Sequence, residues 1–137
     1  MAFPEVSVDI ISEFEAIIGK EHVILDEARR QEYAHDKTED YSFLPAIVLK
    51  PGTTEEISRI MKICDAHRMP VTPRGAGTGL AGAALPTHHG VVLSMERFNK
   101  ILHIDELNLQ ATVEPGVITE VFQNAVKEKG LFYPPDP

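Results

Sequence analysis

A glycine-rich and almost uncharged segment constrains the fold of this chain more than any other feature. Between residues 70 and 95 the only formal charge is that of Arg74, and five of the nine glycines in the chain lie there, four of them close together at positions 75, 77, 79 and 82. The residues on both sides, 69–73 and Val91–Ser94, have the short apolar pattern of buried strands. Residues 83–90, between the glycines and the second strand, are too few for a helix that crosses a sheet, and Pro86 interrupts them. The segment therefore predicts a strand, a tight loop and a second strand.

The loop has the spacing of a known nucleotide motif, but its surroundings argue against two common nucleotide folds. Gly77 to Gly82 reads G-x-G-x-x-G, and Glu96 ends the next strand pattern, as in a Rossmann fingerprint. That fingerprint requires a helix directly after the glycines, and no helix fits. A P-loop requires a Gly-Lys-Ser/Thr sequence, and no lysine occurs between Lys62 and Lys100.

The backbone of the loop indicates what it can bind. Glycine permits positive φ and a close approach, so consecutive N–H groups can turn inward and hold an anion, of which phosphate is the natural example. Thr78 can add a hydroxyl donor, and Arg74 can either bind the phosphate or brace the loop through backbone carbonyl groups. The alternative is a loop that packs tightly and binds no ligand.

The rest of the chain alternates helix and strand patterns. Residues 7–18 have the apolar spacing of a helix, and Thr53 and Glu56 form a capping box that begins a second helix. The apolar stripe of this second helix consists of Ile57, Ile60, Met61 and Cys64. Cys64 is therefore expected in the core and not as a nucleophile. The other predicted elements are strands at 46–49 and 69–73 joined by a parallel crossover, a hairpin with strands at 101–104 and 109–113, and a helix at 118–126.

Composition and charge exclude several classes of function. The chain has 137 residues, 43% of them hydrophobic, and a formal charge of −8, which suits one soluble domain and disfavours nucleic-acid or anionic-membrane binding. The single cysteine excludes an internal disulfide and a multi-cysteine metal site, and no two of the six histidines have the spacing of a helical zinc pair. No apolar run reaches the roughly 20 residues that span a bilayer, and no signal pattern is present, so we expect a cytoplasmic protein.

Three segments taken together resemble the FAD-linked oxidases of the vanillyl-alcohol oxidase superfamily, which carry a PCMH-type FAD-binding domain. They are Val71–Gly82 with the sequence VTPRGAGTGLAG, Val113–Val117 with VEPGV, and Leu131–Pro137 with LFYPPDP. Within this superfamily the chain is most similar to the group that contains the FAD-linked glycolate oxidases and the flavin-dependent D-lactate dehydrogenases. The similarity runs from about residue 10 to 137, and the order of the motifs is more specific than any one of them.

The resemblance implies a set of FAD-binding residues. In the family the glycine loop wraps the pyrophosphate of FAD, prolines near the first strand and a Pro-Gly element lie near the adenine, and a Pro-Asp element approaches the flavin. The corresponding residues are Arg74, Gly75, Ala76, Gly77, Thr78, Gly79 and Gly82 for the pyrophosphate, Pro51, Pro115 and Gly116 for the adenine, and Pro135 and Asp136 for the flavin side. Some members attach FAD covalently through a histidine in the loop. Thr78 stands at that place here, which implies non-covalent FAD.

The resemblance also implies the fold class and the domain organisation. We expect an α+β fold that forms the first part of the PCMH-type domain: a small parallel β-α-β unit with flanking helices, followed by mixed or antiparallel strands. Residues 1–45, with 11 acidic and 4 basic side chains, are expected to form an acidic helical segment, and residues 46–137 the first part of the FAD domain. Family members continue with the rest of that domain and a substrate cap domain that holds the catalytic groups. We therefore expect a fragment without a catalytic residue.

The function implied is that of the FAD-binding part of an oxidoreductase. Such an enzyme oxidises a D-2-hydroxy acid, such as glycolate or D-lactate, to the 2-oxo acid by hydride transfer to the flavin. The expected partners are FAD and a small 2-hydroxy acid, and apolar surface left by the missing part favours self-association or partner subunits. Two alternatives stay open: an FAD domain like that of the UDP-N-acetylenolpyruvoylglucosamine reductases, and, for the isolated fragment, a non-catalytic nucleotide-binding module.

Overall fold

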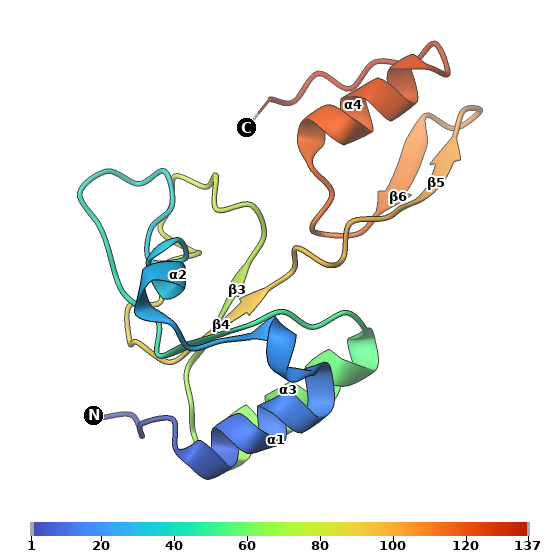
Figure 1. Cartoon of the computed structure of the whole chain (residues 1–137). Coiled ribbons are helices and arrows are strands. Elements are labelled where there is room, and N and C mark those ends of the chain that lie inside the picture. Colours follow the sequence, from blue (N-terminus) through green and yellow to red (C-terminus); the bar gives the residue numbers. More distant parts are fainter. Residues whose placement is uncertain (1, 137) are drawn as a thin grey trace.

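The helices and strands form two parts, which are joined by residues 95–100. The computed structural model describes residues 2–136, so Met1 and Pro137, the outer ends of the expected domain ranges, lie outside the described residues. The first part is a four-stranded sheet with its helices, and the second is a two-stranded hairpin with the last helix (Figure 1). The elements are α1 (Val8–Ile18), η1 (Lys20–His22), β1 (Val23–Ile24), α2 (Glu27–Gln31), β2 (Ile47–Leu49), α3 (Thr54–Ala66), β3 (Val71–Arg74), β4 (Val91–Ser94), β5 (Ile101–Asp105), β6 (Gln110–Val113) and α4 (Thr119–Lys127).

The first helix lies within the predicted range 7–18, and local signals set both of its ends. Ser7 caps α1, since its hydroxyl oxygen accepts a hydrogen bond from Ile10 N at 3.3 Å. Gly19 ends the helix with a φ of 87°, which a glycine adopts without strain. The buried side chains of α1 are Ile10, Phe14 and Ile18, so one face of this helix packs inward.

Helix α3 begins with the predicted capping box. Thr53 Oγ1 accepts a hydrogen bond from Glu56 N at 3.1 Å, and the Glu56 carboxylate accepts from Thr53 N at 3.1 Å and from Gly52 N at 2.6 Å. Ile60 is fully buried, but Met61 is 42% exposed. The prediction that Met61 belongs to the buried stripe is therefore wrong, because one helical position turns its side chain about 100° away from Ile60, toward solvent.

The main sheet has the strand order β1-β2-β4-β3. Strand β1 is antiparallel to β2, with Val23 opposite Leu49, whereas β2 and β3 both run parallel to β4, with Arg74 opposite Ser94. Helix α3 joins β2 to β3 as predicted, and β4 lies between these two strands. The carboxyl ends of β2, β4 and β3 therefore meet at one edge of the sheet.

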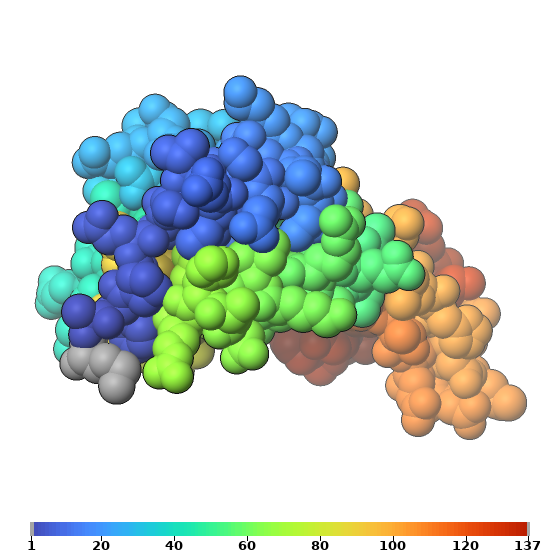
Figure 2. Space-filling view, turned by 90° about the horizontal axis from the view of Figure 1, so that it is seen from below, coloured from blue at the N-terminus to red at the C-terminus, as the bar shows by residue number. Residues whose placement is uncertain are grey.

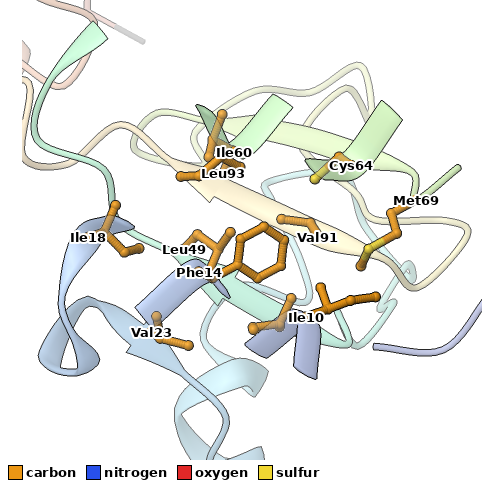
Figure 3. Close-up of a cluster of buried hydrophobic side chains, with 11 residues drawn as sticks. Ile10, Phe14, Ile18, Val23, Leu49, Ile60, Cys64, Met69, Val91 and Leu93 are labelled. Carbon is orange, nitrogen blue, oxygen red and sulfur yellow. The ribbon is translucent and has the colours of Figure 1, made fainter. Parts of the chain in front are cut away.

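One hydrophobic core lies between the sheet and the helices α1 and α3. It consists of Ile10, Phe14, Ile18, Val23, Ile47, Leu49, Ile60, Cys64, Met69, Val91 and Leu93. Figure 3 shows the ring of Phe14 among side chains of the sheet and of α3, and Figure 2 shows α1 and α3 side by side on this face of the molecule. Residues from both sides of position 45 share this core, because β1 joins the sheet and α1 packs against α3.

The second part is the β5–β6 hairpin with α4. The strands pair as predicted, with Asp105 opposite Gln110, and α4 carries one buried side chain among the described residues, Val126. The rings of Phe122 and Tyr133 meet edge to face at 4.8 Å between their centroids. None of the residues of β6 is buried, and an apolar groove of about 470 Å³ runs between the hairpin, α4 and residues 130–133. This part therefore contains little closed core.

Three elements were not predicted: η1, β1 and α2. They lie in a charged segment of weak periodicity, where the apolar pattern gives little signal. Helix α2 is five residues long with none of them buried, and it begins at Asp26, whose carboxylate accepts a hydrogen bond from Arg29 N at 3.0 Å. The predicted elements lie within two residues of the observed ones. Within residues 2–136 no helix combines the length and the apolar character needed to cross a bilayer.

Candidate functional site

Charged side chains gather where the parallel strands end. Lys50 follows β2, Arg74 ends β3, and Glu96 lies two residues beyond β4. Because parallel strands end at the same edge, this is the place where ligands bind in open α/β sheets. The ring of Tyr33 joins the cluster, with Arg74 Cζ at 5.6 Å and Lys50 Nζ at 5.8 Å from the ring centroid.

Arg74 braces the end of β3, where the loop begins, against residues 32–35. It is only 8% exposed, and its guanidinium donates to His35 O at 2.8 Å and to Glu32 O at 3.4 Å. Burial lowers the pKa of Arg74, but a guanidinium stays charged at neutral pH, and the ring of Tyr33 offers it a favourable cation–π contact. Of the two roles that the sequence leaves open for Arg74, its contacts are those of a brace, but the carbonyl groups that it holds belong to Glu32 and His35 and not to the loop.

Gly77 and Gly82 are glycines that the backbone requires. Gly77 has a φ of 69°, and a Cβ at this position would collide with the guanidinium of Arg74. Gly82 has a φ of 73°, and its N–H donates to Thr38 Oγ1 at 3.1 Å. A β-branched residue at position 77 would therefore strain the backbone and displace the brace at the same time.

Gly75 and Gly79 are glycines that the fold does not require. Neither has a left-handed φ, and a Cβ on Gly79 would meet no atom of the described chain within 4 Å. A Cβ on Gly75 would lie 3.6 Å from Pro115 O, which is an ordinary contact. The absence of a side chain at these two positions leaves open space beside the backbone, which a ligand can approach closely.

The loop presents backbone donors that have no partner. Among the described residues, none accepts a hydrogen bond from the N–H groups of residues 75–81. The loop is held by residues 37 and 38, since Lys37 N donates to Gly79 O at 3.1 Å and Gly82 N donates to Thr38 Oγ1 at 3.1 Å. Thr38 N in turn donates to Asp36 Oδ1 at 2.7 Å. Consecutive N–H groups without a partner in a glycine turn are the donors that the predicted anion site would need.

A cleft of about 450 Å³ separates this edge of the sheet from the second part of the chain. Its lining consists of Glu32, Tyr33, Arg74, Gly75, Ala76, Glu96, Asn99, Pro115, Gly116, Val117, Ile118 and Val121. Ile118 and Val121 are 63% and 53% exposed, so the wall formed by the second part is apolar, whereas the sheet edge is polar. A shallower hollow of about 320 Å³ lies along Gly77–Gly79. Together they offer anion donors next to an apolar wall.

Glu96 holds the polar side of the cleft together. Its Oε1 pairs with Lys50 Nζ at 2.5 Å, and its Oε2 accepts from Tyr33 Oη and from Ser94 Oγ, both at 2.9 Å. These contacts tie the ends of β2 and β4 to the segment before the first strand of the parallel set. The Glu96 side chain is 44% exposed, so the carboxylate is oriented by three donors and still reaches the cleft.

The ionisation of this cluster follows from its hydrogen bonds. Burial raises the pKa of Glu96, but donation from Lys50, Tyr33 and Ser94 outweighs it and holds the pKa below the usual value. Burial also lowers the pKa of Lys50, and its hydrogen bonds to Glu96 and Tyr33 reverse this and raise it. Burial raises the pKa of Tyr33. At neutral pH Glu96 and Lys50 are therefore an ion pair and Tyr33 is a neutral donor.

The structure brings together only some of the residues that the resemblance implied. Arg74, Gly75 and Ala76 line the cleft with Pro115 and Gly116, and the adjoining residues Gly77, Thr78 and Gly79 line the neighbouring hollow.

The remaining four residues lie outside both spaces. Pro51 is fully buried behind the strand ends, and Gly82 closes the loop through its bond to Thr38. Pro135 and Asp136 are exposed beside α4, where Pro135 O accepts a hydrogen bond from Gln123 Nε2 at 2.9 Å.

Sequence reasoning missed Tyr33 and Lys50 and assigned no role to Glu96 once the Rossmann fold was set aside. Lys50 and Glu96 follow predicted strands, and that position was the signal that could have found them. Tyr33 lies in the charged segment without periodicity, 63 residues before its partner Glu96, and only the folded chain shows this contact.

Other chemistry has no support in the described residues. They contain no group of three or more His, Cys, Asp or Glu side chains that could hold a metal ion. Cys64 is in the core as predicted, and burial raises its pKa to about 11, so its thiol is protonated and inert at neutral pH.

The donor set fits a dinucleotide. The free N–H groups of the loop suit a pyrophosphate, the open sides of Gly75 and Gly79 permit its close approach, and the apolar wall of Ile118 and Val121 suits a flat aromatic base. A single phosphate or a metal-bound ligand would leave this apolar wall unused.

Comparisons with known proteins point to flavoenzymes. Glycolate oxidase subunit GlcD of Bacillus subtilis is 48% identical over 129 residues, which are 94% of this chain and 27% of that protein. D-lactate dehydrogenase of Anaerostipes hadrus is 33% identical over 136 residues, which are 98% of this chain and 28% of that protein. The chain thus spans little more than a quarter of these curated relatives.

Solved structures agree with the fold that the resemblance implied. p-Cresol methylhydroxylase with substrate bound superposes with a TM-score of 0.78 at 27% identity, over 88% of this chain and 24% of that chain. Alkyldihydroxyacetonephosphate synthase superposes with a TM-score of 0.81 over 98% of this chain and 30% of that chain, and at 20% identity this likeness shows the fold alone.

The assignment of this chain to a family rests on a match to a family model. The model described as "FAD binding domain" matches residues 45–137, which include the glycine loop and all of the cleft lining except Glu32 and Tyr33. The predicted α+β fold of the PCMH type is confirmed, and FAD is the cofactor of this kind of domain. The chain belongs to the FAD binding domain family.

Proposed function

We propose that this chain is the FAD-binding portion of an oxidoreductase that oxidises a D-2-hydroxy acid, such as glycolate or D-lactate, to the 2-oxo acid. One observation carries the FAD site: the N–H groups of residues 75–81 have no acceptor among the described residues and lie beside an open cleft. The substrate class is supported by the glycolate oxidase subunit and the D-lactate dehydrogenase that the chain resembles. The same relatives favour hydroxy-acid oxidation over the reductase alternative.

The residues of this chain bind and orient the cofactor. The loop amides of residues 75–79 would hold the pyrophosphate, with Thr78 as an additional donor, and Pro115, Gly116 and Ile118 would contact the adenine. Bound FAD would accept a hydride from the α-carbon of the hydroxy acid. Arg74 would fix the start of the loop through its bonds to the carbonyl groups of His35 and Glu32. Because position 78 is a threonine, the FAD would be held without a covalent bond.

A titration of the 137-residue chain with FAD and with FMN tests the cofactor site. FMN is the control because it lacks the pyrophosphate and the adenosine that the loop and the apolar wall would bind. We expect saturable quenching of flavin fluorescence with FAD and at least about tenfold weaker binding of FMN, the loss that follows from one missing charge-assisted hydrogen bond. Equal affinity for the two flavins would contradict the assignment of the loop.

The reaction requires a protein of the length of the relatives. In such a protein, which contains this chain, anaerobic addition of glycolate or D-lactate should bleach the oxidised flavin absorbance, whereas L-lactate should not. The 137-residue chain loaded with FAD should show no bleaching, since it supplies binding without a catalytic group. Bleaching of the short chain would show that the catalytic residues lie within it.

A further inference from the structure

The cleft contains an ionised carboxylate that the proposed function leaves unused. Glu96 lines the cleft, yet it belongs to neither the loop that holds the pyrophosphate nor the apolar wall. Its side chain is 44% exposed, although Lys50, Tyr33 and Ser94 all contact it. A carboxylate that served only to join the strand ends would not need to face the cleft.

The acceptor capacity of Glu96 is not exhausted. A carboxylate offers about four lone-pair directions, and the three described partners take one on Oε1 and two on Oε2. These donors fix the rotamer of the side chain and keep it charged. The remaining direction can therefore accept a hydrogen bond from a ligand hydroxyl without any rearrangement of the site.

The position of Glu96 in the cleft indicates which hydroxyl group of a ligand it would bind. Glu96 follows β4, which lies between β2 and β3 in the sheet. It shares the cleft with Gly75 of the loop and Ile118 of the apolar wall. In a dinucleotide, the group between a pyrophosphate and an adenine is the ribose. A carboxylate is the acceptor that ribose hydroxyls favour, and it rejects a phosphate at the same place by charge repulsion.

We propose that Glu96 accepts a hydrogen bond from a hydroxyl of the adenosine ribose and so selects dinucleotides whose adenosine carries free 2′- and 3′-hydroxyls. This inference rests on the proposed FAD site in the same cleft. Glu96 is thus a determinant of cofactor specificity, and Lys50 and Tyr33 act through it by holding its carboxylate in place.

The test compares FAD with two analogues whose adenosine ribose lacks either the 2′- or the 3′-hydroxyl, by fluorescence titration at pH 7. In the wild-type chain at least one analogue should bind about tenfold to a hundredfold more weakly than FAD, which is the range for a hydrogen bond to a charged group. In Glu96→Gln this penalty should fall to about threefold or less, because the acceptor has lost its charge.

The matched control is Glu106→Gln. Glu106 also pairs with a lysine, Lys129, at 3.7 Å, but it lies in the hairpin turn and does not line the cleft. This variant should keep the full penalty of the wild type. A penalty that persists in Glu96→Gln would show that another group accepts the hydroxyl and would overturn the proposal.

The titration of the wild-type chain with FAD and the two analogues tests the proposal even if a variant fails to fold. Tight FAD binding with neither analogue penalised would overturn the role of Glu96 and leave the FAD site intact. No FAD binding to the wild-type chain would overturn the proposed function and the role of Glu96 with it. The two failures therefore give different results in one titration series.

Discussion

At the residue scale, Gly77 combines two demands that few other positions share. Its φ of 69° lies in the left-handed region, and the space where a Cβ would stand is filled by the guanidinium of Arg74. Gly79, two residues on, has neither constraint. The pair separates a glycine that shapes the loop from one that leaves room for a ligand.

We expect Gly77→Val to lose FAD affinity by more than about tenfold and to lower the free energy of unfolding by about 1–3 kcal/mol, because the valine strains the backbone and displaces Arg74. Gly79→Ala should keep its stability within about 0.5 kcal/mol, since its methyl group meets no neighbour. Urea unfolding and FAD titration of both variants measure these effects. Unchanged FAD affinity in a folded Gly77→Val chain would refute the role of the loop.

The pH dependence of stability reports on Glu96. Burial opposes its ionisation, but hydrogen bonds from Lys50, Tyr33 and Ser94 lower its pKa below the value of an unfolded glutamate. A depressed carboxyl pKa adds stability above the unfolded pKa, and this stability is lost as the pH falls through the folded pKa. The contribution of Glu96 should thus be complete at pH 7 and decline below about pH 4.5.

Glu96→Gln removes this contribution. We expect the difference in unfolding free energy between the wild type and the variant to be largest near pH 7 and to shrink toward pH 3, where the wild-type carboxyl is protonated as well. Urea unfolding at a series of pH values measures it. A difference that is the same at pH 7 and pH 3 would mean that the charge of Glu96 contributes nothing to the fold.

At the element scale, the turn after β4 and the Pro-Gly segment after β6 connect the two parts of the molecule. Gly116 N donates to Phe98 O at 2.7 Å, and a Cβ on Gly116 would collide with the backbone carbonyl of Met95. Backbone atoms cannot move aside as a flexible side chain can. Gly116 therefore sets the distance between the sheet and the hairpin with its helix.

We expect Gly116→Ala to lower the free energy of unfolding by about 1–3 kcal/mol, which is the usual cost of overpacking. The matched control is Gly75→Ala on the opposite wall of the cleft, where the methyl group would lie 3.6 Å from Pro115 O. This control should unfold like the wild type and still bind FAD more weakly. Equal stability of the two variants would show that the junction adapts to the extra methyl group.

The sequence predicted elements best where local signals agree. Ser7 and the Thr53–Glu56 box mark the starts of the two core helices, and the predicted strand Val91–Ser94 coincides with β4. Strand β1 has two residues, and α2 buries none of its five, so neither leaves an apolar period to detect. Strand β1 forms by pairing with β2, which is distant in sequence, and the one local signal of α2 is its cap at Asp26.

At the scale of the whole molecule, the candidate site was predictable on one side only. The glycine loop is evident from composition, and Pro115 and Gly116 from a motif that follows it. The contact of Tyr33 with Glu96 spans 63 residues and depends on the position of β4 between β2 and β3, which spacing along the chain does not determine. Sequence reasoning therefore identified the candidate loop donors and missed the polar side of the cleft around Glu96.

FAD bound in the cleft as proposed would couple the two parts of the molecule. The loop of residues 75–81 is in the first part of the molecule, and residues 115–121 are in the second part. The hairpin and helix of the second part contain little closed core of their own. A two-stranded hairpin is marginal without further cover. A ligand that contacts both walls should therefore stabilise the second part more than the first.

Hydrogen exchange measures this coupling in the wild-type chain. With saturating FAD we expect slower exchange of the amides of residues 75–81, which would then have acceptors, and also of the hairpin and α4, whose opening would require loss of the ligand. FMN at the same concentration should protect neither set, since it lacks the groups that reach both walls. Protection confined to the loop would show that the two parts bind independently, and the apolar wall of Ile118 and Val121 would then have no share in holding the cofactor.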